Sequence, residues 1–441
     1  MRRLAALILL LAATPAAAQA PSPDTIATRV RFFGAANVDP QTGAVRPDRA
    51  IFTWFGVTNF AVAMRGHVLL FDAWIPRGEY SGYVKTTPEE LAKLKPEAIM
   101  IGHAHFDHAA DAVPIAEASG APLVGTAEHC AELQARASGR MPPRCIAAIP
   151  AGAGFGATNQ LSLFDDIEIV AVKHLHSGAK NPDGSDSGGY HVPVLSSPST
   201  TTLEHPPTPA DMAQLVQHAP DAEGGSVLYR FKTAGTTFLW HDTSGPLVDE
   251  APQTFDVFRS LRPIDVEIGA IQGFNQISNG MRDVRLYIEA FAPRLFVPTH
   301  HDNWAPGITT TGDYYEAPLH DELQRMPAEQ RPQVRFIKDP GDYLNPPVLT
   351  FPLHLADPRL VRRCIGDGRL RVELRGELGL VRGAQFRFDA KRTRSATSAP
   401  YRVTFTRAQL ERTRSRRLAA TVTTLDGPLA LKRTLPRCGL R

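Results

Sequence analysis

The chain has little that would tie it to a membrane or to a polyanion. Its net charge is only +3, from 48 Lys+Arg and 45 Asp+Glu in 441 residues, so charge alone indicates no polyanionic partner. The apolar run at residues 4–13 is shorter than the roughly 18 residues of a membrane-spanning helix. No cysteine follows that run, which argues against a lipid anchor. The hydrophobic content of 43% and the charged content of 21% are those of an ordinary soluble protein.

The first residues indicate an exported protein instead. Two arginines precede the apolar run, and small residues at 16–20 provide a cleavage site, which is the pattern of a secretory signal peptide. Cleavage is expected after Ala18, because cleavage after Ala20 would place a proline at the scissile bond. The sequence therefore predicts a signal peptide over residues 1–18 and a periplasmic or secreted mature protein.

Cysteine is scarce, and its even number fits an oxidising compartment. The four cysteines allow three disulfide connectivities. The simplest pairs Cys130 with Cys145 and Cys364 with Cys438. Metal ligation by these thiols is disfavoured, because none lies beside a histidine cluster.

Imidazoles and carboxylates are concentrated in one hexapeptide after the apolar residues 99–102, and it reads His103-Ala104-His105-Phe106-Asp107-His108. Side chains two apart on an extended segment point the same way, so His103 and His105 can bind one ion. If Asp107 opens a helix, Asp107 and His108 turn toward a neighbouring position. A buried cluster of this kind is hard to satisfy without a cation. Because thiolate is absent, the ligands suit two zinc ions, with iron or manganese as alternatives.

Strands alternate with helices up to about residue 300, which predicts an α/β domain over residues 21–355. The hexapeptide is expected to run into a helix over residues 107–119. Residues 177–225 break the alternation and are rich in Ser, Thr, Gly and Pro. A loop this long is usually functional, and we expect it to cover the substrate, with Tyr190 and His191 as contacts.

From residue 357 the composition changes to 21 Lys+Arg against 7 Asp+Glu. Short alternating runs such as residues 370–374 and 401–405 predict a small immunoglobulin-like all-β sandwich over 357–441, closed by the Cys364–Cys438 disulfide. The arginines are interpreted as solvated outer faces. Binding to an anionic envelope component is the alternative, and no motif for nucleic acid is present.

Further ligand candidates lie at the ends of predicted strands: His174 or His176, Asp242, and His300 or His301. Strand ends that face one way deliver their side chains to a common crevice. One ion would take His103, His105 and a later histidine. The other would take Asp107, His108 and His300, with Asp242 bridging the two.

This order of ligands resembles the metallo-β-lactamase-fold hydrolase superfamily over roughly residues 50–305. The superfamily implies a four-layer αβ/βα sandwich with the metals at one edge. Asp72, at the end of the strand 68–71, matches the superfamily's early aspartate, which usually orients ligands from behind. Residues 53–56 (Thr-Trp-Phe-Gly) resemble the branch of sugar-phosphate lactonases and N-acyl-phosphatidylethanolamine-type phospholipase D enzymes.

His176 is preferred over His174 as the third ligand, because its following serine resembles the His-Ser pattern of that branch. His300 is preferred over His301, because it comes first after its strand. The remaining candidates for substrate contact are then His174, His301 and Trp304, with Tyr190 and His191 from the long loop.

The resemblance implies that a water shared by two zinc ions becomes the nucleophile, with Asp107 and Asp242 as the catalytic carboxylates. We therefore predict an exported binuclear-metal hydrolase in which a metal-bridging hydroxide cleaves an ester, lactone or phosphodiester bond. The substrate would be a small or lipid-like molecule. No Gly-X-Ser-X-Gly motif lies near a candidate residue, which agrees with a metal route.

Three other functions fit the sequence less well. Superfamily members that hydrolyse β-lactams generally have a cysteine or a non-ligand in place of Asp242. The di-iron redox members resemble His-X-Glu-X-Asp, whereas here His105 replaces that glutamate and no flavin domain follows. A non-catalytic envelope-binding protein would use the basic β-sandwich and keep the metal site as a relic, which the complete ligand set argues against.

Overall fold

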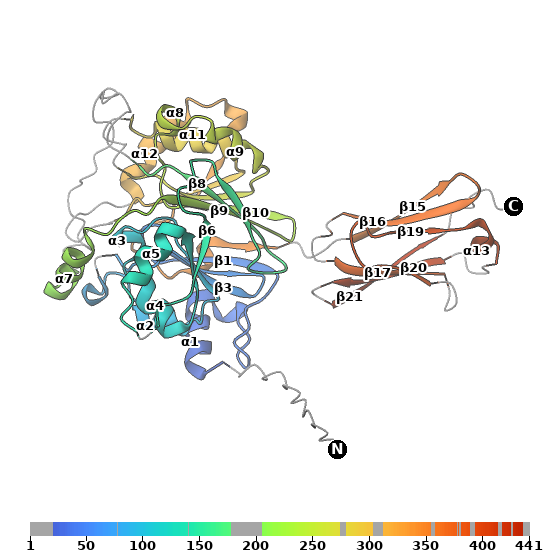
Figure 1. Ribbon diagram of the computed structural model, residues 1–441, viewed down its shortest axis with the longest axis horizontal. Coiled ribbons are helices and arrows are strands. Elements are labelled where there is room, and N and C mark those ends of the chain that lie inside the picture. Colours follow the sequence, from blue (N-terminus) through green and yellow to red (C-terminus); the bar gives the residue numbers. More distant parts are fainter. Residues whose placement is uncertain are drawn as a thin grey trace, which may run out of the picture.

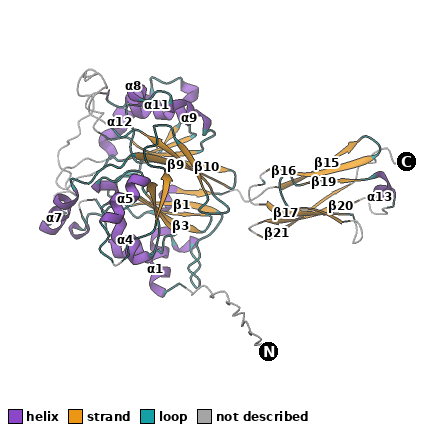
Figure 2. Ribbon diagram, in the orientation of Figure 1, coloured by secondary structure: helices purple, strands orange, loops and turns teal. Residues whose placement is uncertain are grey.

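The computed structural model describes residues 21–434, apart from 77, 140, 178–204, 274–278, 303–311, 354–357, 377, 379–380, 389–392, 413–416 and 425–426. An α/β part runs to residue 353, and an all-β part begins at residue 358 (Figures 1 and 2). The predicted signal peptide lies outside the described residues. No helix among the described residues combines the length and apolar character required to cross a bilayer.

The first sheet of the α/β part has the strand order β14-β1-β2-β3-β4-β5-β6. The pairs from β14 to β3 are antiparallel, and those from β3 to β6 are parallel. Its strands are β1 (Arg49–Trp54), β2 (Phe60–Met64), β3 (His67–Phe71), β4 (Ala98–Met100), β5 (Leu123–Thr126), β6 (Cys145–Ile149) and β14 (Thr350–Pro352).

The second sheet has the order β13-β12-β11-β10-β9-β8-β7 and packs face to face on the first. Aromatic rings fill the space between them: Phe71 of the first sheet lies 4.9 Å from Phe231 and 4.8 Å from Trp240, measured between ring centroids. Its strands are β7 (Thr158–Leu161), β8 (Glu168–His174), β9 (Ser226–Thr233), β10 (Thr236–His241), β11 (Val266–Ala270), β12 (Leu295–Thr299) and β13 (Gln333–Val334).

Helices cover the outer face of each sheet (Figure 1). On the first sheet these are α1 (Pro23–Phe33), α2 (Pro88–Lys93), α3 (Phe106–Ala109), α4 (Ala112–Ser119) and α5 (Ala127–Ala135). On the second they are α8 (Leu247–Glu250), α9 (Thr254–Ser260), α11 (Arg282–Phe291) and α12 (Gly312–Leu323). The predicted αβ/βα sandwich is thereby confirmed. Within the predicted loop 177–225, the structure places a helix that was not expected, α7 (Pro209–His218).

The expected single helix over residues 107–119 is wrong in one respect, because it is broken into α3 and α4. Asp111 stands at the break. Its backbone N–H donates to the carbonyl oxygen of Ala73, and its carboxylate accepts from the backbone N–H of Ile75. Because the Asp111 N–H bonds to Ala73 and not to the residue four positions earlier, the helical hydrogen-bond pattern is interrupted, and the helix ends and begins again here. The strand-to-helix junction that carries the hexapeptide is thus tied to the residues after β3.

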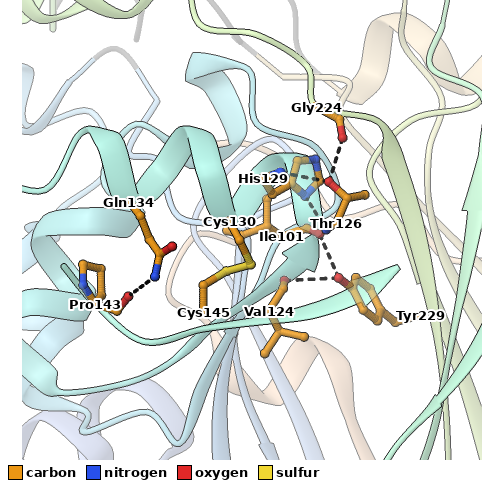
Figure 3. Close-up of a disulfide and its surroundings, with 10 residues drawn as sticks. All are labelled: Ile101, Val124, Thr126, His129, Cys130, Gln134, Pro143, Cys145, Gly224 and Tyr229. Carbon is orange, nitrogen blue, oxygen red and sulfur yellow. Dashed lines mark hydrogen bonds between the residues drawn. A yellow bond between two sulfur atoms is a disulfide. The ribbon is translucent and has the colours of Figure 1, made fainter. Parts of the chain in front are cut away.

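The predicted disulfide between Cys130 and Cys145 is confirmed, and it joins α5 to the start of β6 (Figure 3). In the same region the Tyr229 hydroxyl, from the second sheet, lies 3.0 Å from the carbonyl oxygen of Ile101 and 3.2 Å from that of Val124. This contact fastens the two sheets together just before the hexapeptide. Cys364 lies in β15, and Cys438 is outside the described residues.

His67 links the two sheets at the opposite edge and gives a pH-dependent contribution to stability. Its imidazole contacts Glu97 at 2.9 Å and Asp166 at 3.1 Å. Burial alone would lower the pKa of His67, but the two carboxylates raise it from 6.5 to about 9. A raised pKa means that the stabilisation is complete below pH 6.5 and is lost as the pH rises through about 9.

We expect His67→Gln to lower the free energy of unfolding by about 1 kcal/mol in mildly acidic buffer, since Glu97 is half exposed and screened. The difference from the unaltered protein should vanish above the raised pKa. Urea unfolding of both proteins across this range measures it. A difference that stayed constant with pH would mean that His67 contributes by packing alone.

The all-β part consists of two sheets around one apolar core that includes Leu370, Phe386 and Phe405. The three-stranded sheet is β15-β16-β19 and the four-stranded sheet is β18-β17-β20-β21. Their bounds are β15 (Pro358–Ile365), β16 (Arg369–Gly376), β17 (Val381–Arg387), β18 (Thr393–Ala396), β19 (Arg402–Phe405), β20 (Arg417–Thr424) and β21 (Gly427–Thr434), with the short helix α13 (Arg407–Glu411). The expected all-β carboxy-terminal part is confirmed.

Candidate metal centre

The predicted ligands come together from the ends of four strands. The hexapeptide follows β4, and His176 follows β8. Asp242 follows β10, and His300 follows β12. Strand β4 belongs to the first sheet, and the other three strands belong to the second. The site therefore lies between the two sheets, at the carboxyl ends of these four strands.

Three histidines form the first group. Ligand atoms of His103, His105 and His176 lie within 4.8 Å of one another, and the Nε2 atoms of His103 and His176 are 3.2 Å apart. His103 is buried, and the other two are partly buried. Three imidazoles at this spacing match the ligand set of a zinc ion with an open fourth position.

The hydrogen bonds around this group test whether a cation fits. His176 Nδ1 lies 2.7 Å from the carbonyl oxygen of Ser177, which can only accept, so the proton of a neutral His176 is on Nδ1. His103 Nδ1 lies 2.6 Å from a carboxylate oxygen of Asp242. With Asp242 ionised, both Nδ1 atoms donate, and the two Nε2 atoms then face each other with lone pairs. A metal ion placed between two such lone pairs would bind both, so these residues fit a bound cation.

The second group contains Asp107, His108 and His300. The Nε2 atoms of His108 and His300 are 3.2 Å apart. Asp107 Oδ2 lies 3.5 Å from the first and 3.4 Å from the second. His300 adopts a left-handed backbone with φ 57°, which turns its side chain from the end of β12 toward the hexapeptide. The structure thus brings together the three side chains assigned to a second ion.

Asp72 lies behind this second group. Its Oδ2 is 2.7 Å from His108 Nδ1 and accepts from the Thr58 hydroxyl at 2.7 Å, while Oδ1 accepts from the backbone N–H of Gly102. A carboxylate on the Nδ1 side of a ligand histidine fixes the ring and leaves Nε2 to bind metal. Asp72 is completely buried, so its contacts are confined to these neighbours.

The contacts of Asp242 differ from those expected of a carboxylate that bridges two metal ions. Its Oδ2 contacts His103 Nδ1 and lies 3.5 Å from His108 Nδ1, and neither of these nitrogens faces His176 or His300. Its other oxygen, Oδ1, is buried without a hydrogen-bond partner among the described residues. Gly102 makes room for this carboxylate, since a Cβ there would lie 2.1 Å from Asp242 Cγ. The bridging role of Asp242 stays a prediction.

The electrostatics of the two groups differ. Burial, together with the neighbouring His176, lowers the pKa of His105 to about 4, and burial likewise lowers that of His176 to about 4. These histidines are neutral at pH 7, as metal ligation requires. Burial would raise the pKa of Asp107, but His108 and His300 hold it well below its usual value. Asp107 is therefore an ionised ligand.

A cavity of about 220 Å³ opens onto the centre. It exposes ligands of both groups, and its wall adds six residues that were not predicted to line the site: Phe106, Ser177, Ala219, Thr243, Gln272 and Gly273. Gln272 follows β11, a strand that was not predicted, and its Oε1 is buried without a partner among the described residues. Recognising the strand would have placed Gln272 by the same strand-end rule.

Two expected substrate contacts are wrong. His174, the last residue of β8, is completely buried, and its Nδ1 lies 3.0 Å from the hydroxyl of Tyr287 in α11, whereas His176 lies beyond the end of the strand. His301 is also completely buried, between Trp54 and Phe336, and does not reach the rim. Tyr190, His191 and Trp304 lie outside the described residues.

Comparison with known proteins identifies relatives of this arrangement. No family model matches the chain. A UPF0173 metal-dependent hydrolase of Pyrobaculum neutrophilum is 27% identical over 292 residues, covering 66% of this chain and 98% of the relative. One of Methylacidiphilum infernorum is 29% identical over 139 residues, covering 32% and 55%.

The aligned length agrees with the α/β part, and the ligand order His-X-His-X-Asp-His, His, Asp, His converges on one edge of an αβ/βα sandwich. The chain is therefore similar to metal-dependent hydrolases, and it has the αβ/βα sandwich of the metallo-β-lactamase fold. Among solved structures, it is similar to a metallo hydrolase of Ignicoccus hospitalis at 18% identity and a TM-score of 0.41, covering 69% of this chain and 98% of that one.

The predictions of a metal-dependent hydrolase and of candidate metal-binding clusters of histidine and aspartate are confirmed. Two ions, and zinc as their identity, stay predictions. The all-β part is an addition to the αβ/βα sandwich.

Proposed function

We propose that the protein is an exported binuclear-metal hydrolase that cleaves a small neutral ester or lactone. The observation that carries the metal-dependent chemistry is the pair of facing Nε2 atoms of His103 and His176, both neutral and 3.2 Å apart. The export part of the proposal rests on residues 1–20 alone, and fractionation of the producing cell tests it.

The chain's own residues define what the site can do. His103, His105 and His176 would hold one divalent cation, and Asp107, His108 and His300 a second, with Asp242, which lies beside His103 and His108, as the candidate bridging carboxylate. Bound cations of this kind lower the pKa of water and polarise a substrate oxygen. The carbonyl of Ser177 holds the Nδ1 proton of His176, and Asp72 holds that of His108.

The cavity wall supports a neutral substrate. None of the described residues that line the cavity is a lysine or arginine, so the described part of the wall offers no side-chain cation to the extra negative charge of a phosphodiester. Gln272 Oε1, buried without a described partner, can accept a hydrogen bond from the substrate. Phe106 and Ala219 supply apolar surface that excludes water from the reacting bond.

A panel of chromogenic substrates tests the proposal. The purified protein is loaded with zinc, iron or manganese, its metal content is measured, and turnover of an ester, a lactone, a phosphodiester and a β-lactam is compared. We expect two equivalents of metal and the highest kcat/KM on the ester or lactone. A preference for the phosphodiester or the β-lactam would overturn the substrate class. Absence of any metal-dependent turnover would support the non-catalytic alternative.

A further inference from the structure

The outer face of the three-stranded sheet β15-β16-β19 is rich in arginine. Leu370, Val372 and Leu374 of β16 point into the core, so the alternate residues point outward. Following the strand register, the outward positions that carry a positive charge are Arg359, Arg363, Arg369, Arg371, Arg375 and Arg402. This set is called the arginine face.

Acidic partners on this face are few. Glu373 is the one carboxylate among its outward strand positions, and it pairs with Arg375 at 2.5 Å and with Arg402 at 3.0 Å. Asp367, in the turn between β15 and β16, lies 3.6 Å from Arg369. Among the described residues, these contacts neutralise only part of the face.

The strand register places like charges directly opposite each other. Arg359 pairs with Arg375, and Arg363 with Arg371, across β15 and β16. Like charges at directly opposed positions of an antiparallel pair destabilise the sheet. The arrangement therefore does not serve the stability of the sandwich, and it makes sense when an anion lies over the sheet.

The opposite sheet provides an internal comparison. Across its outer face, Arg387, Ala419 and Lys432 lie side by side, and Gln385, Thr421 and Ala430 form the next row. Basic residues there alternate with small and polar ones. The concentration of arginine is thus a property of one face of the sandwich and does not follow from the composition of the domain alone.

We propose that the arginine face docks the protein on a membrane surface that is rich in anionic phospholipid. Strands are spaced by about 4.8 Å and outward residues by roughly 7 Å along a strand, so the guanidinium groups form a broad array that matches an array of headgroups. Guanidinium binds phosphate oxygens in a bidentate manner. Val361 and Ile365, half-buried among the arginines, offer apolar contact at the interface.

Single-stranded nucleic acid is disfavoured by the same residues, because its binding sites stack bases on aromatic side chains and the outward positions of these three strands hold none. The proposal is independent of the proposed hydrolase function, since it concerns the other part of the chain. It assigns the all-β part the role of bringing the metal centre to a lipid surface.

Vesicle binding of the mature chain, residues 19–441, tests the proposal. Sedimentation is compared between vesicles of phosphatidylcholine alone and vesicles that also contain phosphatidylglycerol. We expect binding only to the second kind and a loss of binding with added salt. The double variant Arg363→Gln/Arg371→Gln should bind about thirtyfold more weakly, since each basic residue near an anionic bilayer contributes about fivefold.

The matched control is Arg387→Gln/Lys432→Gln on the opposite sheet, which removes the same charge and should bind as the unaltered protein does. The arginine variant should unfold at the same temperature or higher, because it removes an opposed pair of like charges. Turnover of a soluble substrate should be the same in all three proteins. Equal weakening by both variants, equal binding to neutral vesicles, or tighter binding to duplex DNA than to the anionic vesicles would overturn the proposal.

Discussion

Replacing Asp107 with asparagine is expected to lower metal-dependent kcat/KM about a thousandfold. The carboxylate lies 3.4 Å from His300 Nε2 and 3.5 Å from His108 Nε2 and contributes the negative charge of the second group. Asparagine has the same shape but no charge, so the second ion loses its anionic ligand. Stabilisation by a metal amounts to several kcal/mol, which corresponds to a factor of this size.

Asp111→Asn is the matched control for this prediction. Asp111 lies four residues further on, accepts a hydrogen bond from the Ile75 backbone, and has a pKa that burial raises to about 7. It is not among the candidate ligand clusters, so its variant should keep both metal equivalents and nearly full turnover. Metal content and kcat/KM are measured on all three proteins. Two equivalents of metal and unchanged turnover in Asp107→Asn would contradict the assignment of the second group.

Replacing Asp72 with asparagine is expected to weaken metal binding by roughly 10- to 100-fold. The asparagine loses the charge that holds the Nδ1 proton of His108, which lies 2.7 Å from Asp72 Oδ2. The backbone of Asp72 is left-handed, with φ 50°, and asparagine tolerates this conformation. The amide oxygen can still accept from the backbone N–H of Gly102, so the fold should be retained.

Competition with a chromogenic chelator measures the metal affinity of Asp72→Asn. Because Asp72 acts through His108, excess metal should restore most of the turnover, which would not happen if the variant damaged the reacting geometry itself. An unchanged affinity, or a loss that excess metal does not reverse, would show that Asp72 does not position the ligand.

The hexapeptide shows how far local sequence can reach. His103, His105, Asp107 and His108 are close along the chain, and the strand-to-turn geometry that follows an apolar strand limits where they can point. The sequence also placed His176, Asp242 and His300 at strand ends, and the structure brings all three to the same edge. Strand ends are predictable because a short apolar run stops where polar ligands begin.

The errors concern residues whose environment depends on distant parts of the chain. His174 and His301 each lie within two residues of a ligand, yet one packs on Tyr287 and the other between Trp54 and Phe336. Their partners are up to about 250 positions away, so no local pattern distinguishes them from true contacts. Gln272 was missed because a fully buried parallel strand, Val266–Ala270, has no alternation to reveal it.

The sequence by itself determined the layered α/β class, the ligand types and their order, because hydrophobic runs and ligand spacing are local properties. Tertiary structure alone decided which ring nitrogen of each histidine is left for a metal, since Asp72, Ser177 and Asp242 accept hydrogen bonds from the Nδ1 atoms of His108, His176 and His103. It also decided that the arginines of the all-β part gather on one sheet face, because strand register is fixed by pairing partners far apart along the chain.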